Sequence, residues 1–197
     1  IRNAGNIQER ELATQQLQNG ILRLRHLIQQ LLILARLEPD GQSVVQERID
    51  LSALCKSVIL EKYILAEKKH IDLGLASDEV AEITGDPHML RILLNNLIDN
   101  AIRYTPEHGR IDVFACHKKD FIELSVRDNG PGIPTEERDR IFDRFVRGNV
   151  HQDVQGSGLG LSIVKRIAEH HQATIELSDA ENGKGLNVSV KFPMLIL

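Results

Sequence analysis

Hydrophobic residues near the start of the chain recur with the spacing of one helix face. Between residues 12 and 37 the intervals alternate between four and three residues, a heptad pattern, at Leu17, Ile21, Leu24, Ile28, Leu31 and Ala35. Leu27, Leu32 and Leu34 widen this stripe, and Pro39-Asp40-Gly41 ends the helix. The stripe fits a helix packed on its own domain or one helix of a bundle or dimer, and its width favours the bundle.

After residue 41 the pattern changes to shorter helices and strands. Asp50 and Asp86-Pro87 are typical helix starts, because a carboxylate accepts the first free amide hydrogens and proline fits the first turn. The predicted helices cover Asp50 to about Ala66, Asp86 to about Tyr104, and about Leu159 to His170. Alternation of apolar and polar residues predicts strands at 44–49, 71–76, 80–84, 110–116, 121–127, 174–177 and 186–192. This grouping predicts an α+β layer structure with a mostly antiparallel sheet.

Composition and charge narrow the class of protein. The chain has 197 residues, of which 42% are hydrophobic and 26% charged, so it can bury a core and is not intrinsically disordered. Its net charge of −4 argues against a nucleic-acid-binding protein, which usually carries a basic surplus. No apolar run approaches the roughly 20 residues that cross a bilayer. Cys55 and Cys116 lack the spacing of a metal site or a disulfide framework.

A polar stripe lies on the helix predicted to end near Tyr104. Asn96, Asn100 and Arg103 follow each other at four and three residues, so they share one face. Amides are poor helix formers, whereas carboxamide oxygens suit Mg²⁺ and an adjacent arginine suits phosphate. By itself the stripe fits a solvated helix face or a magnesium–phosphate site.

The segment Asp128-Asn129-Gly130-Pro131-Gly132-Ile133 follows directly after a predicted strand. A carboxylate at this place can accept a hydrogen bond from an exocyclic amine such as that of adenine, and the glycines let the backbone approach a flat ring. A simple β-turn explains the same residues equally well.

A second glycine-rich segment, Gly156-Ser157-Gly158-Leu159-Gly160, leads directly into a predicted helix. Free amide groups and the positive end of the helix dipole make such a start suitable for phosphate. The segment is neither a Walker P-loop, which ends in Gly-Lys-Ser/Thr, nor a dinucleotide fingerprint, which follows a strand within a βαβ unit.

Taken in order, these motifs resemble the N, G1, F and G2 boxes of the sensor histidine kinases. The boxes correspond to Asn96–Ala101, Asp128–Ile133, Ile141–Phe145 and Gly156–Gly160. Gly183-Lys184-Gly185 resembles the short glycine motif before the family's last strand. The resemblance covers about residues 44–193 and implies a Bergerat-type ATP-binding domain over residues 41–197. Its implied fold is a two-layer α/β sandwich with a mixed, mostly antiparallel sheet, preceded by a helical dimerisation segment.

The resemblance also implies roles for individual residues. Asn96 and Asn100 hold Mg²⁺, Arg103 and Tyr104 flank the phosphates, and Asp128 accepts the adenine amino group. Catalysis rests on Asn96, Asn100 and Arg103. Further nucleotide contacts come from Gly130, Gly132, Ile133, Gly156, Ser157, Gly158, Leu159 and Gly160. The segment between Asn129 and Gly156 is implied to be a lid, with Phe142 and Phe145 docking it and Arg147 as a further phosphate contact.

The implied activity is that of a protein-histidine kinase that transfers the γ-phosphoryl group of Mg-ATP. The related gyrase-type ATPases carry a general-base glutamate at the place of Asn96, and an amide cannot accept a proton from water in that way, so ATP hydrolysis is disfavoured. A related ATPase or serine-directed kinase is one alternative. A nucleotide-binding regulatory module without phosphotransfer is another.

The family's acceptor histidine, with its acidic, aliphatic, basic and Ser/Thr-Pro sequel, has no counterpart in this chain. His26 is followed by Leu27, Ile28 and Gln29. We therefore expect residues 1–40 to be a partial dimerisation hairpin without its acceptor, in a fragment that starts at Ile1 and cannot phosphorylate itself. The expected partners are a response regulator receiver domain and a second copy of the hairpin, with no nucleic acid. The resemblance places this chain in the cytoplasmic portion of a bacterial membrane sensor whose membrane segments lie elsewhere in the protein.

Overall fold

A computed structural model describes residues 46–77, 79–146, 157–180 and 183–194, together with Arg10, Ala13, Thr14, Leu17, Gly20, Ile21, Leu24 and Ile28. The chain divides into two compact units, Ile1–Glu38 and Pro39–Leu197. No helix in the described part of the chain is both long and apolar enough to cross a membrane.

The described residues of the first unit are all helical, in agreement with the helix predicted over residues 12–37. Its apolar stripe is exposed at each position that the structure describes, namely Leu17, Ile21, Leu24 and Ile28. The other members of the stripe, and His26, lie outside the described residues.

Helices of the second unit begin where the predicted capping residues stand. Asp50 caps α2 (Leu51–Glu67) by accepting the Ser52 amide hydrogen at 2.9 Å. Asp86 caps α3 (Pro87–Tyr104) by accepting from the amides of His88 and Met89. The helix α4 (Gly160–His170) and the 3₁₀ turn η1 (Thr135–Glu137) follow later in the chain. Short-range capping therefore determined where α2 and α3 start.

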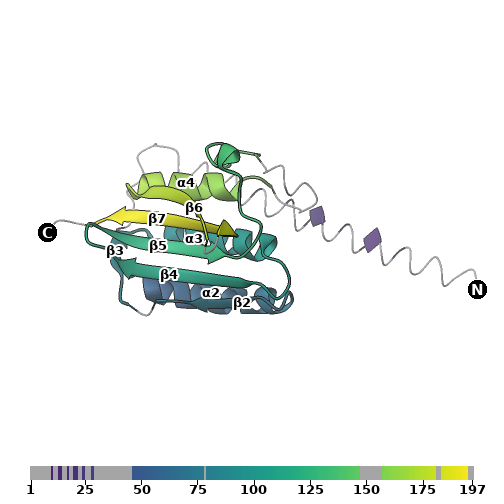
Figure 1. The fold of residues 1–197 in the computed structure, drawn as a ribbon, viewed down its shortest axis with the longest axis horizontal. Helices are drawn as coiled ribbons and strands as arrows, with labels where there is room; N and C mark the ends of the chain where they lie inside the picture. The colour runs from purple at the N-terminus through teal and green to yellow at the C-terminus, as the bar shows by residue number, and fades with distance from the viewer. Residues whose placement is uncertain are drawn as a thin grey trace, which may run out of the picture. The chain divides into compact units, whose positions relative to one another are not determined.

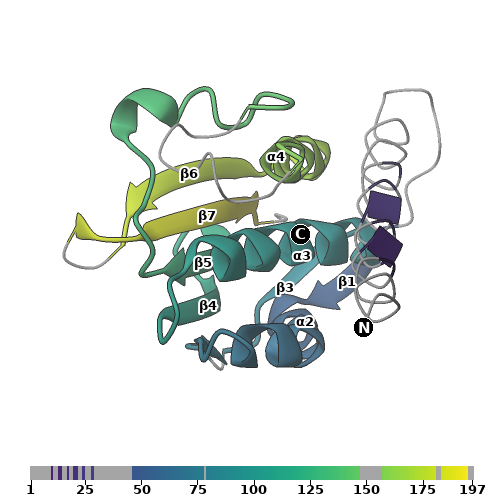
Figure 2. The ribbon, with the colours of Figure 1, turned by 90° about the vertical axis from the view of Figure 1, so that its right-hand side faces the viewer.

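The sheet is mixed and mostly antiparallel, as predicted. Its strands lie in the order β2 (Asp72–Leu75), β4 (Arg110–His117), β5 (Phe121–Asp128), β7 (Leu186–Pro193) and β6 (Thr174–Asp179). The β2–β4 pair is parallel and the other pairs are antiparallel. Figure 1 shows the sheet in front of α2, α3 and α4, and Figure 2 shows these helices together on one side of it. The second unit is therefore a two-layer sandwich in which the helices that the structure describes cover one face of the sheet.

Two short strands depart from the prediction because they form a sheet of their own. Strands were expected at 44–49 and 80–84, whereas β1 (Glu47–Asp50) pairs with β3 (Glu82–Gly85), and Gln46 lies outside the strand. Their antiparallel register joins Glu47 to Gly85 and Asp50 to Glu82. Mutual pairing thus sets the strand limits, and the pattern within each segment cannot reveal its partner.

Candidate functional site

The polar face of α3 is turned toward the start of α4. A Cβ atom placed on Gly160 would lie 3.2 Å from Oδ1 of Asn96 and 3.4 Å from Nδ2 of Asn100. The side-chain amide of Asn96 donates to the Ile92 carbonyl at 2.8 Å, which leaves its Oδ1 on the α4 side. Glycine at the first position of α4 therefore lets the helix N-terminus lie against two carboxamides.

The start of α4 carries free backbone donors. Among the residues that the structure describes, no side chain caps this helix, although Ser157 Oγ accepts the Leu159 amide hydrogen at 3.2 Å. The amide groups of the first turn have no partner within their own helix and lie at the positive end of its dipole. This end of α4 is suited to bind an anion.

Strand alternation directs the Asp128 side chain toward the helices. In β5 the buried positions include Ile122, Leu124 and Val126, and Asp128 continues the same face with only 7% of its surface exposed. Its Oδ1 accepts the Gly130 amide hydrogen at 2.8 Å. Burial raises the pKa of the Asp128 carboxyl above its ordinary value, while hydrogen bonds from the Gly130 and Leu186 amides oppose this shift. A largely buried acceptor held by its own turn is suited to pair with a donor on a flat ligand.

Two backbone segments approach the Asp128 turn so closely that glycine is required. Gly185 has φ +88°, and a Cβ there would overlap the Asp128 carbonyl oxygen. Gly132 has φ +76°, and its Cβ would lie 2.9 Å from the Gly185 carbonyl oxygen. Gly130 lies against the Tyr104 carbonyl, 3.0 Å from where its Cβ would be. The turn after β5 is therefore packed between the end of α3 and the Gly183-Lys184-Gly185 segment.

The first part of the predicted lid is attached to the domain at two places. The Arg138 side chain donates to the Ile133 carbonyl at 3.0 Å and pairs with Asp179 at the end of β6. Further on, the Phe145 amide donates to the Gly158 carbonyl at 2.9 Å, while the Phe145 ring is 64% exposed and its φ is +65°. Phe145 is thus attached to the Gly158 segment through its backbone.

The structure describes some of the remaining predicted site residues and not others. Arg103, Tyr104 and Phe142 are half-buried. Arg147 and Gly156 lie outside the described residues. Within the described residues no group of three or more His, Cys, Asp or Glu side chains is placed to hold a metal. A cation held here would rely on carboxamide oxygens, water and ligand phosphates, the mixed shell that Mg²⁺ prefers.

Sequence analysis assigned no role to Arg138 or His171, since neither stands in a recognisable motif. His171 follows α4, and its Nε2 accepts the backbone amide hydrogen of Asp86 at 3.1 Å. His171 and Asp86 are brought together only by the packing of α4 beside α3.

The sequence matches a known protein family over most of the second unit. The family model described as "Histidine kinase-, DNA gyrase B-, and HSP90-like ATPase" matches residues 85–196, more than half of the chain. Sensor protein kinase PmrB of Pseudomonas aeruginosa is 38% identical over 178 residues, which are 90% of this chain and 37% of that protein. The chain therefore spans well under half the length of this curated relative.

Solved structures of histidine kinases share the fold. The Acinetobacter baumannii histidine kinase AdeS superposes with a TM-score of 0.76 at 26% identity, over 92% of this chain and 83% of that chain. A structure of the cytoplasmic segment of histidine kinase QseC has a TM-score of 0.59 at 32% identity, over 87% of this chain and 93% of that chain.

Proposed function

The chain belongs to the histidine kinase-, DNA gyrase B- and HSP90-like ATPases, as a sensor histidine kinase catalytic domain, and on that premise we propose the chemistry of its site. Residues 41–197 bind Mg-ATP and transfer its γ-phosphoryl group to a histidine on a dimerisation helix of the longer protein. Residues 1–40 are part of the dimerisation hairpin.

The observation that carries this proposal is the position of Gly160 against the Asn96–Asn100 face. That contact joins a phosphate-binding helix start to two oxygen ligands that suit magnesium. Asp128 lies in the turn packed against the last residues of the same helix α3, where the Tyr104 carbonyl approaches Gly130. The helix start and the two asparagines are thus suited to the phosphates and the metal of the ligand. The buried Asp128 carboxyl is suited to its adenine amino group.

Catalysis by this site rests on positioning and charge. Mg²⁺ held by Asn96 and Asn100 would neutralise charge on the phosphate oxygens. The amides at the start of α4, Ser157 to Gly160 among them, hold the phosphates in line, and Arg103 adds positive charge beside them. Asn96 stands where a hydrolytic relative carries a base, and because its carboxamide takes up no proton, water is not activated and an acceptor side chain is preferred.

The wider assignment is supported by the relatives. The matched QseC structure is titled a cytoplasmic segment, and we place this chain likewise in the cytoplasmic part of a bacterial inner-membrane sensor. The exposed stripe Leu17, Ile21, Leu24 and Ile28 supports pairing with a second copy, since an apolar helix face that remains exposed is typical of an interface. The downstream partner is a response regulator receiver domain.

The test separates nucleotide binding from phosphotransfer. Calorimetry with Mg-ADP should show binding that requires magnesium. ATP labelled at its γ-phosphate should then label an acceptor-helix domain supplied in trans, with an acid-labile, base-stable product, and should not label this chain. Binding without any transfer to a matched acceptor would contradict the kinase assignment and favour a regulatory nucleotide-binding module.

Neighbouring asparagines on α3 give a matched control. Asn95 and Asn96 each donate to the carbonyl four residues earlier, at 2.9 and 2.8 Å, but only Asn96 lies against Gly160. Asn96→Ala should abolish labelling and magnesium-dependent binding, whereas Asn95→Ala should retain both. Equal activity of the two variants would remove Asn96 from the proposed metal site.

A further inference from the structure

A single lysine binds the C-terminal end of α3. The Lys69 ammonium group donates to the backbone carbonyls of Ile102 at 2.8 Å, Arg103 at 3.2 Å and Thr105 at 2.7 Å. Lys69 lies in the turn between α2 and β2, more than thirty residues away in sequence. All three hydrogens of the ammonium group are thus directed at one helix end.

Helix termini make this contact energetically favourable. The last carbonyls of a helix have no intrahelical partner and carry the negative end of the helix dipole, so a cation there is stabilising. At the end of α3 the amide of the C-cap residue Thr105 donates to the Ala101 carbonyl at 2.9 Å. Lys69 supplies from outside the helix the donors that the chain after Thr105, which continues as Pro106, does not provide.

The backbone of the same residue holds the next loop. The Lys69 carbonyl accepts the His108 amide hydrogen at 3.1 Å, and the Asp72 amide donates to the Gly109 carbonyl at 2.9 Å. The rings of His70 and His108 are stacked, with their centroids 5.0 Å apart and an angle of 6° between their planes. Residues 105–109 are therefore held on one side by the α2–β2 turn.

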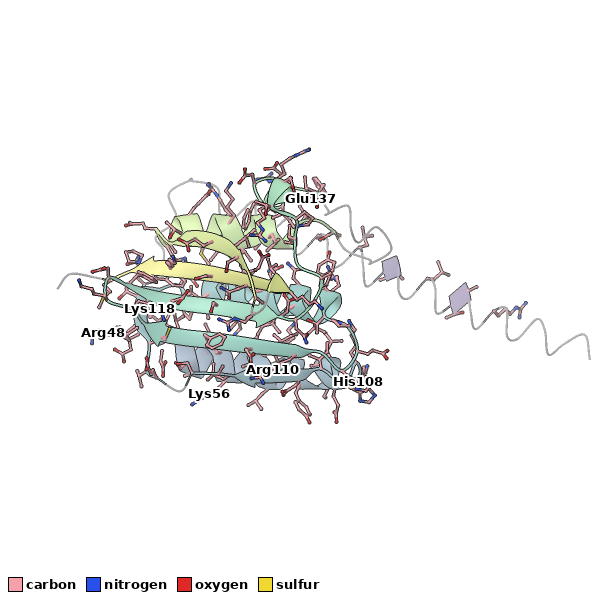
Figure 3. The ribbon with its side chains drawn as sticks, in the orientation of Figure 1. Arg48, Lys56, His108, Arg110, Lys118 and Glu137 are labelled. Carbon is pink, nitrogen blue, oxygen red and sulfur yellow. The ribbon has the colours of Figure 1, made fainter. Side chains whose placement is uncertain are left out.

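The residues that flank this loop, Tyr104 and Arg110, contact the Asp128–Gly130 turn. Arg110 and Asn129 exchange two hydrogen bonds, one at 2.8 Å from the Arg110 amide to Asn129 Oδ1 and one at 3.2 Å between backbones. Gly130 packs on the Tyr104 carbonyl. Figure 3 shows His108 and Arg110 at the same end of the sheet, with Lys118 at the opposite end.

We propose that Lys69 is a positioning residue for base recognition: by fixing the end of α3 and the following loop, it sets the place of the Asp128–Gly130 turn and hence the discrimination for the 6-amino group of adenine. This inference rests on the proposed function. Loss of the Lys69 contacts should therefore change which base the domain prefers, and not only the stability of the domain.

The experiment compares Mg-ATP with Mg-ITP, whose base carries an oxygen in place of the 6-amino group. Wild-type chain should bind Mg-ATP more tightly, because the Asp128 carboxyl accepts from the amino group. Lys69→Met should weaken Mg-ATP binding about tenfold while Mg-ITP binding changes little, so that the ratio of the two affinities falls. Lys69→Arg should restore most of the wild-type preference for Mg-ATP over Mg-ITP, because arginine keeps a cation with several donors at the helix end.

Lys68→Met is the matched control, since Lys68 is the exposed neighbour in the same turn. It should leave both affinities unchanged. An unchanged ratio in Lys69→Met, with only a lower midpoint of thermal unfolding, would reduce Lys69 to a scaffold residue. If Lys69→Met does not fold, Lys69→Gln replaces it, and failure of both to fold would equally contradict the positioning role. Absence of Mg-ATP binding by the wild type would instead overturn the proposed function itself.

Discussion

His171 hydrogen-bonds to the residue that caps α3. Its Nε2 accepts the Asp86 amide hydrogen at 3.1 Å, and its Nδ1 lies 2.8 Å from the Ile167 carbonyl oxygen, to which it donates. The ring also lies against Gly85, where an added Cβ would come within 2.8 Å of Nε2. One neutral imidazole therefore joins the end of α4 to the start of the helix that carries the polar stripe.

This arrangement predicts a pH dependence of stability. Burial lowers the pKa of His171 below its ordinary 6.5, with smaller opposing effects from the Ile167 carbonyl and Asp86. The unfolded chain therefore binds more protons than the folded one between the two pKa values, so the free energy of unfolding falls as pH decreases through 6.5. Urea unfolding between about pH 5 and pH 8 should show this slope.

The control is His171→Gln, which should flatten that part of the profile, whereas His170→Gln should keep it because His170 is exposed. An equal slope in wild type and His171→Gln would assign the dependence to other groups.

Asp128→Asn should separate stability from binding. Because burial raises the pKa of this carboxyl, keeping it charged costs stability at neutral pH, and that cost disappears as pH falls. The amide should therefore raise the free energy of unfolding at pH 7. It should also weaken Mg-ATP binding about 100-fold, because its NH₂ group would face the adenine amino group. Denaturation and calorimetry on the same sample measure both; a destabilised variant would contradict the account of the carboxyl.

Gly183 and Gly185 offer a matched pair for backbone crowding. Both have positive φ, +71° and +88°, but only Gly185 lies against another segment, the Asp128 carbonyl. Gly183→Ala should cost only the conformational strain, roughly 1–2 kcal/mol. Gly185→Ala should cost more and also weaken nucleotide binding, since the Asp128 turn must move. Comparable losses in denaturation midpoint would show that crowding is unimportant.

Gly160→Ala should have opposite effects on folding and on binding. Alanine is a better helix former than glycine by up to about 1 kcal/mol, so α4 should be at least as stable. Its methyl group would lie 3.2 Å from Asn96 Oδ1, the oxygen that we propose as a metal ligand. Titration with Mg²⁺ at fixed ADP should therefore show a weaker magnesium dependence. Unaltered magnesium dependence would place the metal elsewhere.

Much of the fold could be predicted because its signals are local. Asp50 and Asp86 reach amides two or three residues away, and Thr105-Pro106 ends α3 as expected. Alternation in β4 and β5 gave their inward faces. The predicted limits of β1 and β3 differ from the observed ones, because neither segment's own sequence shows that the two strands pair with each other.

For the site, the sequence by itself determined which chemical groups are available: two amides on one helix face, a carboxylate at a strand end, and glycines before a helix. Only the tertiary structure decided that Gly160 lies on Asn96, that Gly185 packs on Asp128, and that Lys69 and His171 hold the two ends of α3. The physical reason is distance along the chain. Spacing fixes neighbours within a few residues, whereas contacts between segments thirty or more residues apart arise only when helices and sheet pack to bury their apolar faces.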